Sequence, residues 1–366
     1  MRSHVTSPRP RRRCHEPRPG QPVSGLPAVL AIDGGNSKTD LALLADDGTV
    51  LAELRGPGAS QEKLGVEGAM RALAPLVRSL AGSASGPVAR HTSACLAGAD
   101  LRSEEEALAD AVRAQGWSAT SAVLNDTFAV LRAGVPYERP WGIAVVCGAG
   151  INCVGVAPGG QATRFLAFGT ITGDWGAGSG LSQQVMWWAM RAEDGRGVPT
   201  SLRPATAAYF GMDSVSDVAI AVHTEQIAVD DLLGLTTVLF AAATEGDPVA
   251  VELVERQGDE IALMALTAMR RLGLDSVHGT PVVLGGGLLQ ARHPQLTTAI
   301  TRRLATAAPG AVPQITDTPP IAGAALLGLD YLAGLADSGA AITRQDAERR
   351  LRRTWAGADG AASPGA

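Results

Sequence analysis

The sequence predicts an α/β protein made of two related domains. The chain has 366 residues, which is long enough for two domains with cores of their own. A unit of one buried strand, a Gly-rich turn and two further strands occurs twice, in residues 31–54 and in residues 143–167. Segments with the periodicity of amphipathic helices separate and follow these units. A repeated unit of this kind is typical of a duplicated half-domain.

The first unit opens on the stretch AIDGGNSKTD, residues 31–40. An apolar run ends at Asp33, and residues 40–44 form a second apolar strand that stops at a turn signal, residues 46–48. The two glycines between these strands therefore lie in a hairpin turn, and residues 49–54 add a third antiparallel strand. The stretch fits neither the P-loop pattern nor the dinucleotide-binding pattern, because the spacing of its glycines differs from both.

A Gly-rich hairpin turn presents backbone N–H groups to an anion, and Ser37, Lys38 and Thr39 add side-chain donors. We therefore expect the turn to bind phosphate. Asp33 would then face a polyphosphate, which is costly unless a cation such as Mg2+ lies between them. An ordinary Gly hairpin with a solvated aspartate is the alternative.

The second unit repeats this design. Residues 143–156 form two strands joined by a Gly turn at residues 148–150, and residues 162–167 form a third strand. Two such turns, facing each other, would hold the two ends of one triphosphate. A third Gly cluster, residues 285–287, follows an apolar strand and fits close approach of the backbone to a nucleotide.

These motifs resemble the superfamily of acetate kinase, sugar kinases, the Hsc70 chaperone and actin. Within it they are similar to the BadF/BadG/BcrA/BcrD ATPase family, and to its N-acetylglucosamine kinase branch in particular. The match covers roughly residues 28–335, and the order of the motifs is more specific than any single motif. The stretches that carry the resemblance are Asp33-Gly34-Gly35, Asn125-Asp126, residues 148–153, Gly173-Asp174 and residues 285–287.

The resemblance implies two ribonuclease H-like (actin-like ATPase) domains with a nucleotide cleft between them, and it implies ATP and Mg2+ as cofactors. Asp33 would organise Mg2+, through water. The ATP-binding residues are then Gly34, Gly35, Asn36, Ser37, Lys38, Thr39, Gly148, Ala149, Gly150, Gly285, Gly286 and Gly287. The substrate-binding residues are Ser60, Asn125, Asp126, Ile151, Asn152, Gly169, Thr170 and Asp174.

Asp126 follows the apolar strand 122–124 and precedes a helix that starts at Phe128. Ligands of α/β sheets bind at strand-to-helix junctions of this kind. A sugar kinase needs one carboxylate that accepts the proton of the attacking hydroxyl, and Asp126 is our candidate for this general base. The alternative is that Asp126 only caps the helix.

The glycine-dense stretch 168–180 contains Asp174 and is suited to wrap closely around a polar ligand. The sequence departs here from the kinases that it resembles, because Trp175 and Ala177 replace a glutamate and a serine. Ala149 also stands in place of a phosphate-binding threonine, and Ser60 near an expected sugar-binding asparagine. Because of these departures, the sequence does not decide whether the substrate is N-acetylglucosamine, glucosamine, N-acetylmuramic acid or another sugar. It also allows for an enzyme that is slower than the kinases it resembles, or that has an altered activity.

The charge and the cysteine content argue against several classes of protein. The formal charge is −5, and residues 1–22 hold six arginines and one glutamate, so the remainder carries −10 and a nucleic-acid-binding body is not expected. No apolar run approaches the ~20 residues that cross a bilayer, and the first residues lack the apolar core of a secretory signal. Cytoplasmic location and reduced thiols are expected. An iron–sulfur cluster needs cysteines grouped around it, and Cys147 and Cys153 flank the turn that should hold phosphate, so Cys14, Cys95, Cys147 and Cys153 are not predicted to hold one.

Four segments are expected along the chain. Residues 1–27 form a disordered basic arm rich in Pro and Arg, and residues 28–138 form the first actin-like domain. Residues 139–335 form the second domain. Its final helix, after Pro319-Pro320, is expected to pack either on this domain or back on the first one. Residues 336–366 form a polar tail that frays.

The sequence therefore predicts ATP-dependent phosphorylation of an amino sugar, N-acetylglucosamine to its 6-phosphate being the first choice. Two alternatives stay open: an ATPase that activates a partner enzyme, and a sugar-sensing protein of the same fold without catalysis. The first would need the cysteine cluster, and the second a helix-turn-helix segment. The expected partner is a small sugar, with no nucleic acid and no membrane, and a homodimer is what the resemblance implies.

Overall fold

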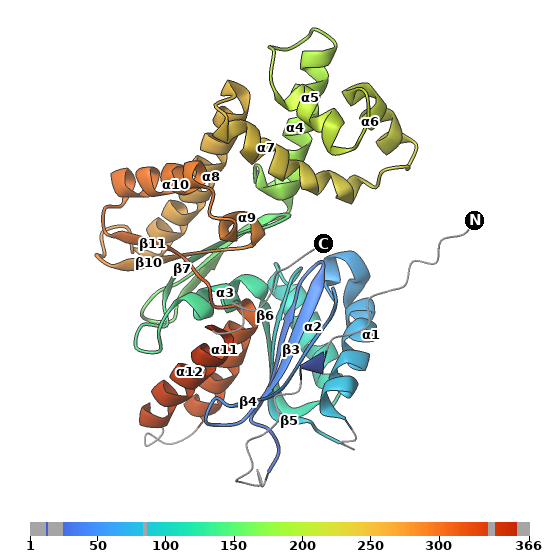
Figure 1. Cartoon of the computed structure of the whole chain (residues 1–366). Coiled ribbons are helices and arrows are strands. Elements are labelled where there is room, and N and C mark those ends of the chain that lie inside the picture. The colour runs from blue at the N-terminus through green and yellow to red at the C-terminus, as the bar shows by residue number, and fades with distance from the viewer. Residues whose placement is uncertain (1–11, 14–24, 83–85, 336–340, 357–366) are drawn as a thin grey trace, which may run out of the picture. The chain divides into compact units, whose positions relative to one another are not determined.

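The computed structural model describes residues 12–13, 25–82, 86–335 and 341–356. Its contacts divide the chain into two compact units (Figure 1): Met1–Pro140 together with Asp317–Ala366, and Trp141–Thr316. The second unit thus ends before residue 335, and the helix after Pro319-Pro320 belongs to the first unit. Most of the arm expected at residues 1–27 lies outside the described residues.

A mixed sheet forms the centre of unit 1. Its strand order is β1-β4-β3-β2-β5-β6. The pairs β1–β4, β4–β3 and β3–β2 are antiparallel, whereas the pairs β2–β5 and β5–β6 are parallel. The antiparallel β2, β3 and β4 confirm the first predicted unit of three strands. The strands are β1 Arg12–Arg13, β2 Val29–Gly34, β3 Lys38–Leu44, β4 Val50–Pro57, β5 Ala89–Leu96 and β6 Ser118–Asn125.

Helices cover both faces of this sheet, which explains why β2 reads as an unbroken apolar run. Leu30 and Ile32 face α1 (Gln61–Ala81) and α2 (Arg102–Ala114), whereas Val29 and Ala31 belong to the cluster formed with α11 (Pro320–Gly334). Figure 1 shows α1 and α2 on one side of the sheet and α11 with α12 (Ala341–Ala356) on the other.

Helix α11 lies close against α3 (Asp126–Gly134) because Gly323 lacks a side chain. A Cβ atom at Gly323 would come within 1.8 Å of the carbonyl oxygen of Ala129. The backbone of the helix that carries the candidate base therefore rests directly on α11.

We expect Gly323→Ala to lower the free energy of unfolding by about 1–3 kcal/mol, since the added methyl group must push the two helices apart. Gly334→Ala is the matched control on the same helix, where a Cβ would meet nothing within 4 Å. Urea unfolding followed by circular dichroism measures both. Equal midpoints for the two variants would contradict the close packing of α11 on α3.

The sheet of unit 2 has the order β11-β10-β7-β8-β9. Its antiparallel strands β7, β8 and β9 confirm the second predicted unit, and β10 is parallel to both β7 and β11. Helix α8 (Pro248–Leu272) packs on β7 and β8. The strands are β7 Gly142–Cys147, β8 Ile151–Val156, β9 Ala162–Arg164, β10 Thr280–Gly285 and β11 Ala311–Ile315.

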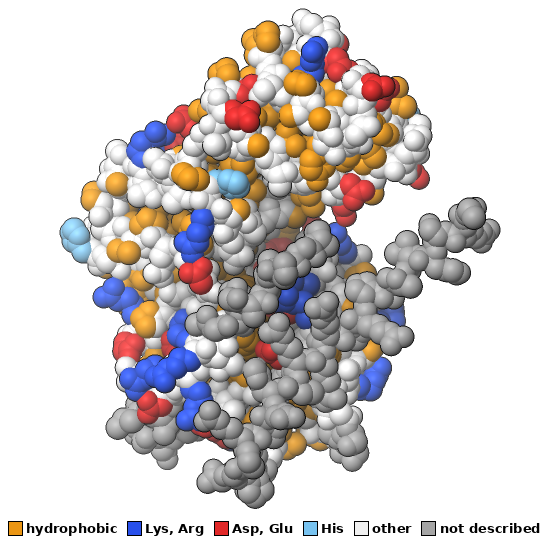
Figure 2. Space-filling view, in the orientation of Figure 1, with side chains coloured by type: hydrophobic (Ala, Val, Ile, Leu, Met, Phe, Trp, Pro, Cys, Tyr) orange, Lys and Arg blue, Asp and Glu red, His pale blue; other side chains and the backbone are white. Residues whose placement is uncertain are grey.

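A group of helices lies between β9 and α8 in unit 2. The space-filling view shows apolar side chains scattered over its visible face (Figure 2). The elements between β9 and α8 are η1 Gly169–Thr172, α4 Ala177–Glu193, α5 Leu202–Tyr209, α6 Val215–His223, η2 Val229–Gly234 and α7 Leu235–Thr244. Helices α9 Gly287–Gln290 and α10 Pro294–Ala307 follow β10.

The prediction that residues 336–366 fray is wrong for the part that is described, because Ala341–Ala356 form α12. Ala347, Leu351 and Trp355 recur at a spacing of four residues and are at most 6% exposed, so they give this charged helix one buried stripe. Residues 336–340 and 357–366 lie outside the described residues. In the arm, Arg12–Arg13 form β1 and pair with β4.

Among the described residues, no helix combines the length and the apolar composition that crossing a bilayer requires.

Candidate active site

The carboxyl ends of three parallel strands meet at one edge of the unit 1 sheet. Gly34 of β2 lies opposite Leu96 of β5, and Leu96 lies opposite Asn125 of β6. The register therefore brings Asp33 and Asp126 to the same edge, as expected for ligand-binding residues of an α/β sheet.

Asn125, not Asp126, caps α3. The Oδ1 atom of Asn125 accepts a hydrogen bond from the backbone N–H of Thr127 at 3.0 Å, and its Nδ2 donates to Oδ1 of Asp100 at 2.9 Å. The alternative in which Asp126 serves as the N-cap is therefore wrong. Asn125 is 2% exposed and its amide is engaged on both sides, so we assign it to holding the junction rather than to contacting substrate.

Asp126 is the first residue of α3 and is partly buried. Burial raises the pKa of Asp126 from 3.8 to about 6, and the negative charge of Glu62 adds to this shift. Hydrogen bonds at the start of the helix act in the opposite direction and keep the shift from becoming larger. A carboxylate with a pKa near 6 is ionised at neutral pH and still has appreciable proton affinity, which suits a general base.

The pKa of Asp33 is shifted further than that of Asp126. Burial, followed by the charges of Asp126 and Asp40, raises the pKa of Asp33 to about 8, although Lys38 and Arg55 oppose the shift. Arg55 is occupied by Asp40, with its Nε 2.5 Å from Oδ1 and its Nη2 2.9 Å from Oδ2. The edge thus holds a carboxyl group whose ionised form is only partly balanced by the neighbouring positive charges. A hard divalent cation such as Mg2+ fits this donor set, since it would supply that charge to oxygen ligands.

We expect Asp33→Asn to raise the thermal midpoint of the ligand-free protein at pH 8. In the unfolded chain the Asp33 carboxyl ionises near pH 4, whereas in the folded protein it ionises only near pH 8. The folded protein therefore loses stability relative to the unfolded chain as the pH rises through this range. Removing the carboxyl removes that loss, and the gain should grow from pH 5 to pH 8 and reach on the order of 1–2 kcal/mol. Differential scanning calorimetry at pH 5 and pH 8 measures this gain, with Asp275→Asn as the control because Asp275 is exposed. A gain that shrinks as the pH rises would refute the assignment.

The turn between β2 and β3 has the form predicted for a phosphate-binding hairpin. Its backbone closes with a 2.9 Å hydrogen bond from the N–H of Gly35 to the carbonyl of Lys38. Asn36, Ser37 and Lys38 are exposed. The Asn36 amide donates to Oε2 of Glu62 at 3.3 Å, and the Lys38 ammonium lies 3.7 Å from Oδ2 of Asp40. Thr39 is fully buried, and its hydroxyl is therefore not placed to meet a nucleotide in solution.

Ser60, which was expected to contact the sugar, is the N-cap of α1. Its hydroxyl accepts a hydrogen bond from the backbone N–H of Glu62 at 3.2 Å and lies 3.4 Å from the carbonyl oxygen of Ala97. The residue is 1% exposed. We therefore assign the Ser60 hydroxyl to the helix cap.

In unit 2, two predicted Gly segments lie side by side at the carboxyl ends of parallel strands. Gly285 of β10 lies opposite Val146 of β7, and Gly286 packs so closely that a Cβ would lie 2.5 Å from the carbonyl oxygen of Cys147. The φ angle of Gly286 is +91°, which side chains rarely permit. Ala149 is exposed on the neighbouring turn. The turn is fixed from behind, since its carbonyls accept hydrogen bonds of 2.8 and 3.0 Å from the first turn of α4.

The predicted sugar-binding residues Ile151 and Asp174 line one cavity of about 160 Å³ in unit 2. Asp174 is oriented by Thr172, whose Oγ1 lies 2.7 Å from its Oδ2. Trp175 also lines the cavity, and the guanidinium of Arg256 lies 4.0 Å from its ring centre. Gly169, Thr170 and Asn152 are not among the lining residues. The other residues that line it are Phe165, Thr172, Gly173, Glu260, Leu263, Met264 and Thr267.

Sequence reasoning did not identify Glu260, Thr172 or Asp40 as site residues. Asp40 was recoverable, because the hairpin register places it opposite Asp33. Glu260 lies on α8, far along the chain from the loop of Asp174, and no local pattern marks it.

Three cysteines are described, and all of them are buried free thiols: Cys95, Cys147 and Cys153. Burial raises the pKa of each, to about 12 for Cys147. Such thiols are poor metal ligands. Within the described residues, no group of three or more His, Cys, Asp or Glu side chains is arranged to hold a metal ion, and Cys14 lies outside them.

The fold belongs to the class of two-domain, ribonuclease H-like ATPases, as predicted. A crystal structure from Chromobacterium violaceum, of a protein assigned as an N-acetylglucosamine kinase, matches with a TM-score of 0.66 at 21% identity and covers 83% of this chain and 99% of that one. The BadF/BadG/BcrA/BcrD ATPase family model matches residues 30–328, so the chain belongs to this family. The family that the motifs predicted is thus confirmed.

Two curated relatives carry functional names. The N-acetylmuramic acid/N-acetylglucosamine kinase of Clostridium acetobutylicum is 26% identical over 70% of this chain and 84% of its own length. The N-acetyl-D-glucosamine kinase of Dictyostelium discoideum is 22% identical over 82% of this chain and 97% of its own length.

Proposed function

We propose that the chain is an ATP-dependent amino-sugar kinase that transfers the γ-phosphoryl group of ATP to the 6-hydroxyl of N-acetylglucosamine. The observation that carries the proposal is the carboxylate of Asp126. It follows a parallel strand, it is not used as the helix cap, and its pKa is raised to about 6. The two curated relatives support an amino sugar as the acceptor, since both are named kinases of N-acetylglucosamine.

Asp126 acts as the general base. Its ionised carboxylate accepts the proton of the sugar hydroxyl as the new O–P bond forms and the bond between the γ-phosphorus and the bridging oxygen breaks, with ADP as the leaving group. Because protonated Asp126 accepts no proton, kcat should fall tenfold per pH unit below about pH 6.

The phosphates are held by the β2–β3 turn, through its backbone and through the side chains of Asn36, Ser37 and Lys38. Lys38 is exposed and brings an ammonium group to this turn. Asp33 would hold Mg2+, which supplies charge neutralisation to the phosphates when bound. In unit 2 the turn at residues 148–150 contacts phosphate, and Gly285, Gly286 and Gly287 line the adenosine side.

The acceptor contacts Asp174 and Ile151, which line the cavity of unit 2. Asp174 is held in one orientation by Thr172, so its free oxygen is a preorganised acceptor for a sugar hydroxyl. Trp175, which replaces a glutamate of the resembling kinases, offers an apolar ring at the same place.

The proposal is tested by Mg2+-dependent ADP release with N-acetylglucosamine, glucosamine, N-acetylmuramic acid and glucose, followed by 31P NMR of the product. Release that depends on N-acetylglucosamine and yields the 6-phosphate supports it. Release with equal rates in the presence and absence of every sugar would overturn it in favour of an ATPase that acts on a partner. No ATP binding at all, measured by calorimetry, would overturn both.

A further inference from the structure

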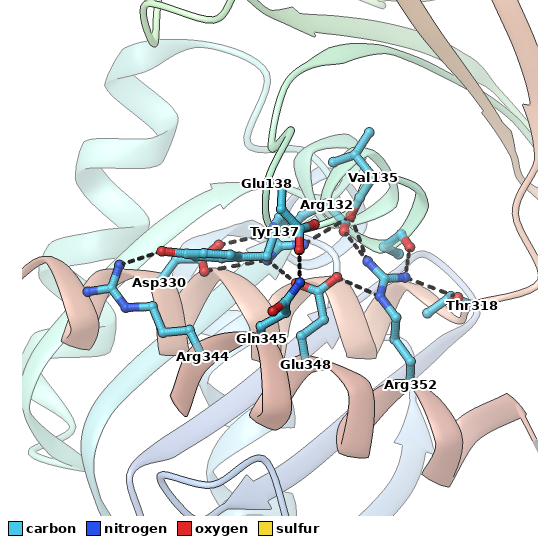
Figure 3. A network of polar contacts seen from close by, with 11 residues as sticks. Arg132, Val135, Tyr137, Glu138, Thr318, Asp330, Arg344, Gln345, Glu348 and Arg352 are labelled. Carbon is cyan, nitrogen blue, oxygen red and sulfur yellow. Dashed lines mark hydrogen bonds and ion pairs between the residues drawn. The ribbon is translucent and has the colours of Figure 1, made fainter. Parts of the chain in front are cut away.

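We propose that α12 positions the catalytic base, with Arg352 fixing the far end of the helix that Asp126 begins. The inference rests on the proposed function and adds positioning residues that lie far from Asp126 in the sequence. Helix α3 runs from Asp126 to Gly134, so the base and the anchored end belong to one short rigid element. Figure 3 shows the polar network at that end.

The side chain of Arg352 acts as a C-cap for α3. The last carbonyls of a helix have no partner within the helix. Arg352 donates to three oxygens in this region: its Nη2 to the carbonyls of Val135 at 2.6 Å and Arg132 at 3.3 Å, and its Nη1 to the carbonyl of Ala133. Its positive charge also lies at the negative end of the helix dipole.

The same end of α3 is tied to two further helices through Arg132, which is 3% exposed. Its Nε lies 2.7 Å from Oδ2 of Asp330 on α11, and its Nη2 lies 2.7 Å from Oε2 of Glu348 on α12. Glu348 in turn accepts from Nε of Arg352 at 2.7 Å. Burial alone would lower the pKa of Arg132, but Asp330 and Glu348 together outweigh this effect and raise it, so the guanidinium stays charged.

The chain after α3 is held by α12 as well. Nη1 of Arg344 donates to the Tyr137 hydroxyl at 3.1 Å, and the side-chain amide of Gln345 donates to Glu138. Figure 3 shows that Arg344, Gln345, Glu348 and Arg352 reach this region from one helix. All these contacts lie within unit 1.

These contacts fix the C-terminal end of α3. Gly323 of α11 supports the helix at Ala129, between the base and the network. If the network is released, movement of the far end about this support moves Asp126 in the opposite direction. A misplacement of about 1 Å costs on the order of 100-fold in rate. Arg352 is therefore a positioning residue, and it acts through α3 rather than on the substrate.

The test compares Arg352→Met with Arg350→Met, a matched control whose guanidinium lies on the same helix but contacts Asp47 and Thr49 instead. Arg352→Met should lower kcat about 10- to 100-fold with little change in the KM for the sugar. Hydrogen–deuterium exchange of the amides in residues 126–134 should be about tenfold faster than in the control. Arg352→Lys, which keeps the charge and donates to fewer carbonyls, should restore part of both.

The outcomes separate the inference from the proposed function. A kcat within twofold of the control, or a reduced kcat without faster exchange in α3, would overturn the positioning role. If the parent protein phosphorylates no sugar, the proposed function fails, and unchanged exchange in Arg352→Met would then overturn the inference by itself. If Arg352→Met does not fold, Arg352→Lys carries the comparison.

Discussion

Asp126→Asn is expected to lower kcat about 1000-fold while leaving the affinity for ATP within a factor of two or three, because a general base contributes about 10²- to 10⁴-fold. Asparagine keeps the shape of the side chain and accepts no proton at neutral pH. The residual rate should also lose the decline below pH 6, since the group with the raised pKa has been removed. Steady-state kinetics from pH 5 to pH 8 with calorimetric ATP binding measure both effects.

Asp259→Asn is a suitable control for this substitution, because Asp259 is an exposed carboxylate on α8. It makes the same chemical change in unit 2, outside the unit that carries Asp126, and should alter kcat less than twofold. Retention of the acidic limb in Asp126→Asn would show that another group titrates, and Asp33 would be the next candidate.

The strands that surround the site were predictable because both faces of them are buried. In β2, alternate side chains contact different helix layers, so the whole strand is apolar and ends abruptly at Asp33. β7 is also buried along almost its whole length, and a Gly turn after each of the two strands fixes the hairpin that follows. Local signals of this kind do not depend on distant residues, which is why both three-strand units and the edge that carries Asp126 were recovered.

Side-chain assignments were less predictable, because they depend on what fills the space around each group. Thr39 and Ser60 have the right chemistry for a ligand contact, yet both are buried, one inside the sheet and one in a helix cap. Asn125 and Asp126 are both good N-cap residues, and only the geometry shows that Asn125 takes this role.

Helix α12 was missed for a related reason. Its composition is highly charged, and only three apolar residues mark its buried side, so its sequence has the appearance of a solvated tail. Its charged side is paired through Arg132, Asp330 and Glu348, which lie in three different helices. A buried arginine in the apolar segment of α3 was the available signal, because such a side chain requires carboxylate partners from elsewhere.

Arg132→Met is expected to lower the free energy of unfolding of unit 1 by about 3–5 kcal/mol. Methionine fills similar space, but it leaves the buried Glu348, which is 5% exposed, with Arg352 as its remaining ion-pair partner, and it removes the guanidinium from the half-buried Asp330. Arg71→Met is the matched control, since Arg71 and its partner Glu67 are exposed and such pairs contribute about 0.5 kcal/mol or less. Urea unfolding followed by circular dichroism measures the difference.

The double variant Arg132→Met/Glu348→Gln distinguishes the loss of attraction from the cost of the charge left behind. If most of the damage comes from the Glu348 carboxylate, which has lost one of its two arginine partners, neutralising it should recover about 1–2 kcal/mol, even though one more charged contact has been weakened. Arg352 would still donate to the remaining amide oxygen. If the double variant is less stable than Arg132→Met alone, the network stabilises the fold mainly through its direct attractions, and α12 would then be held by the sum of its contacts rather than by charge balance.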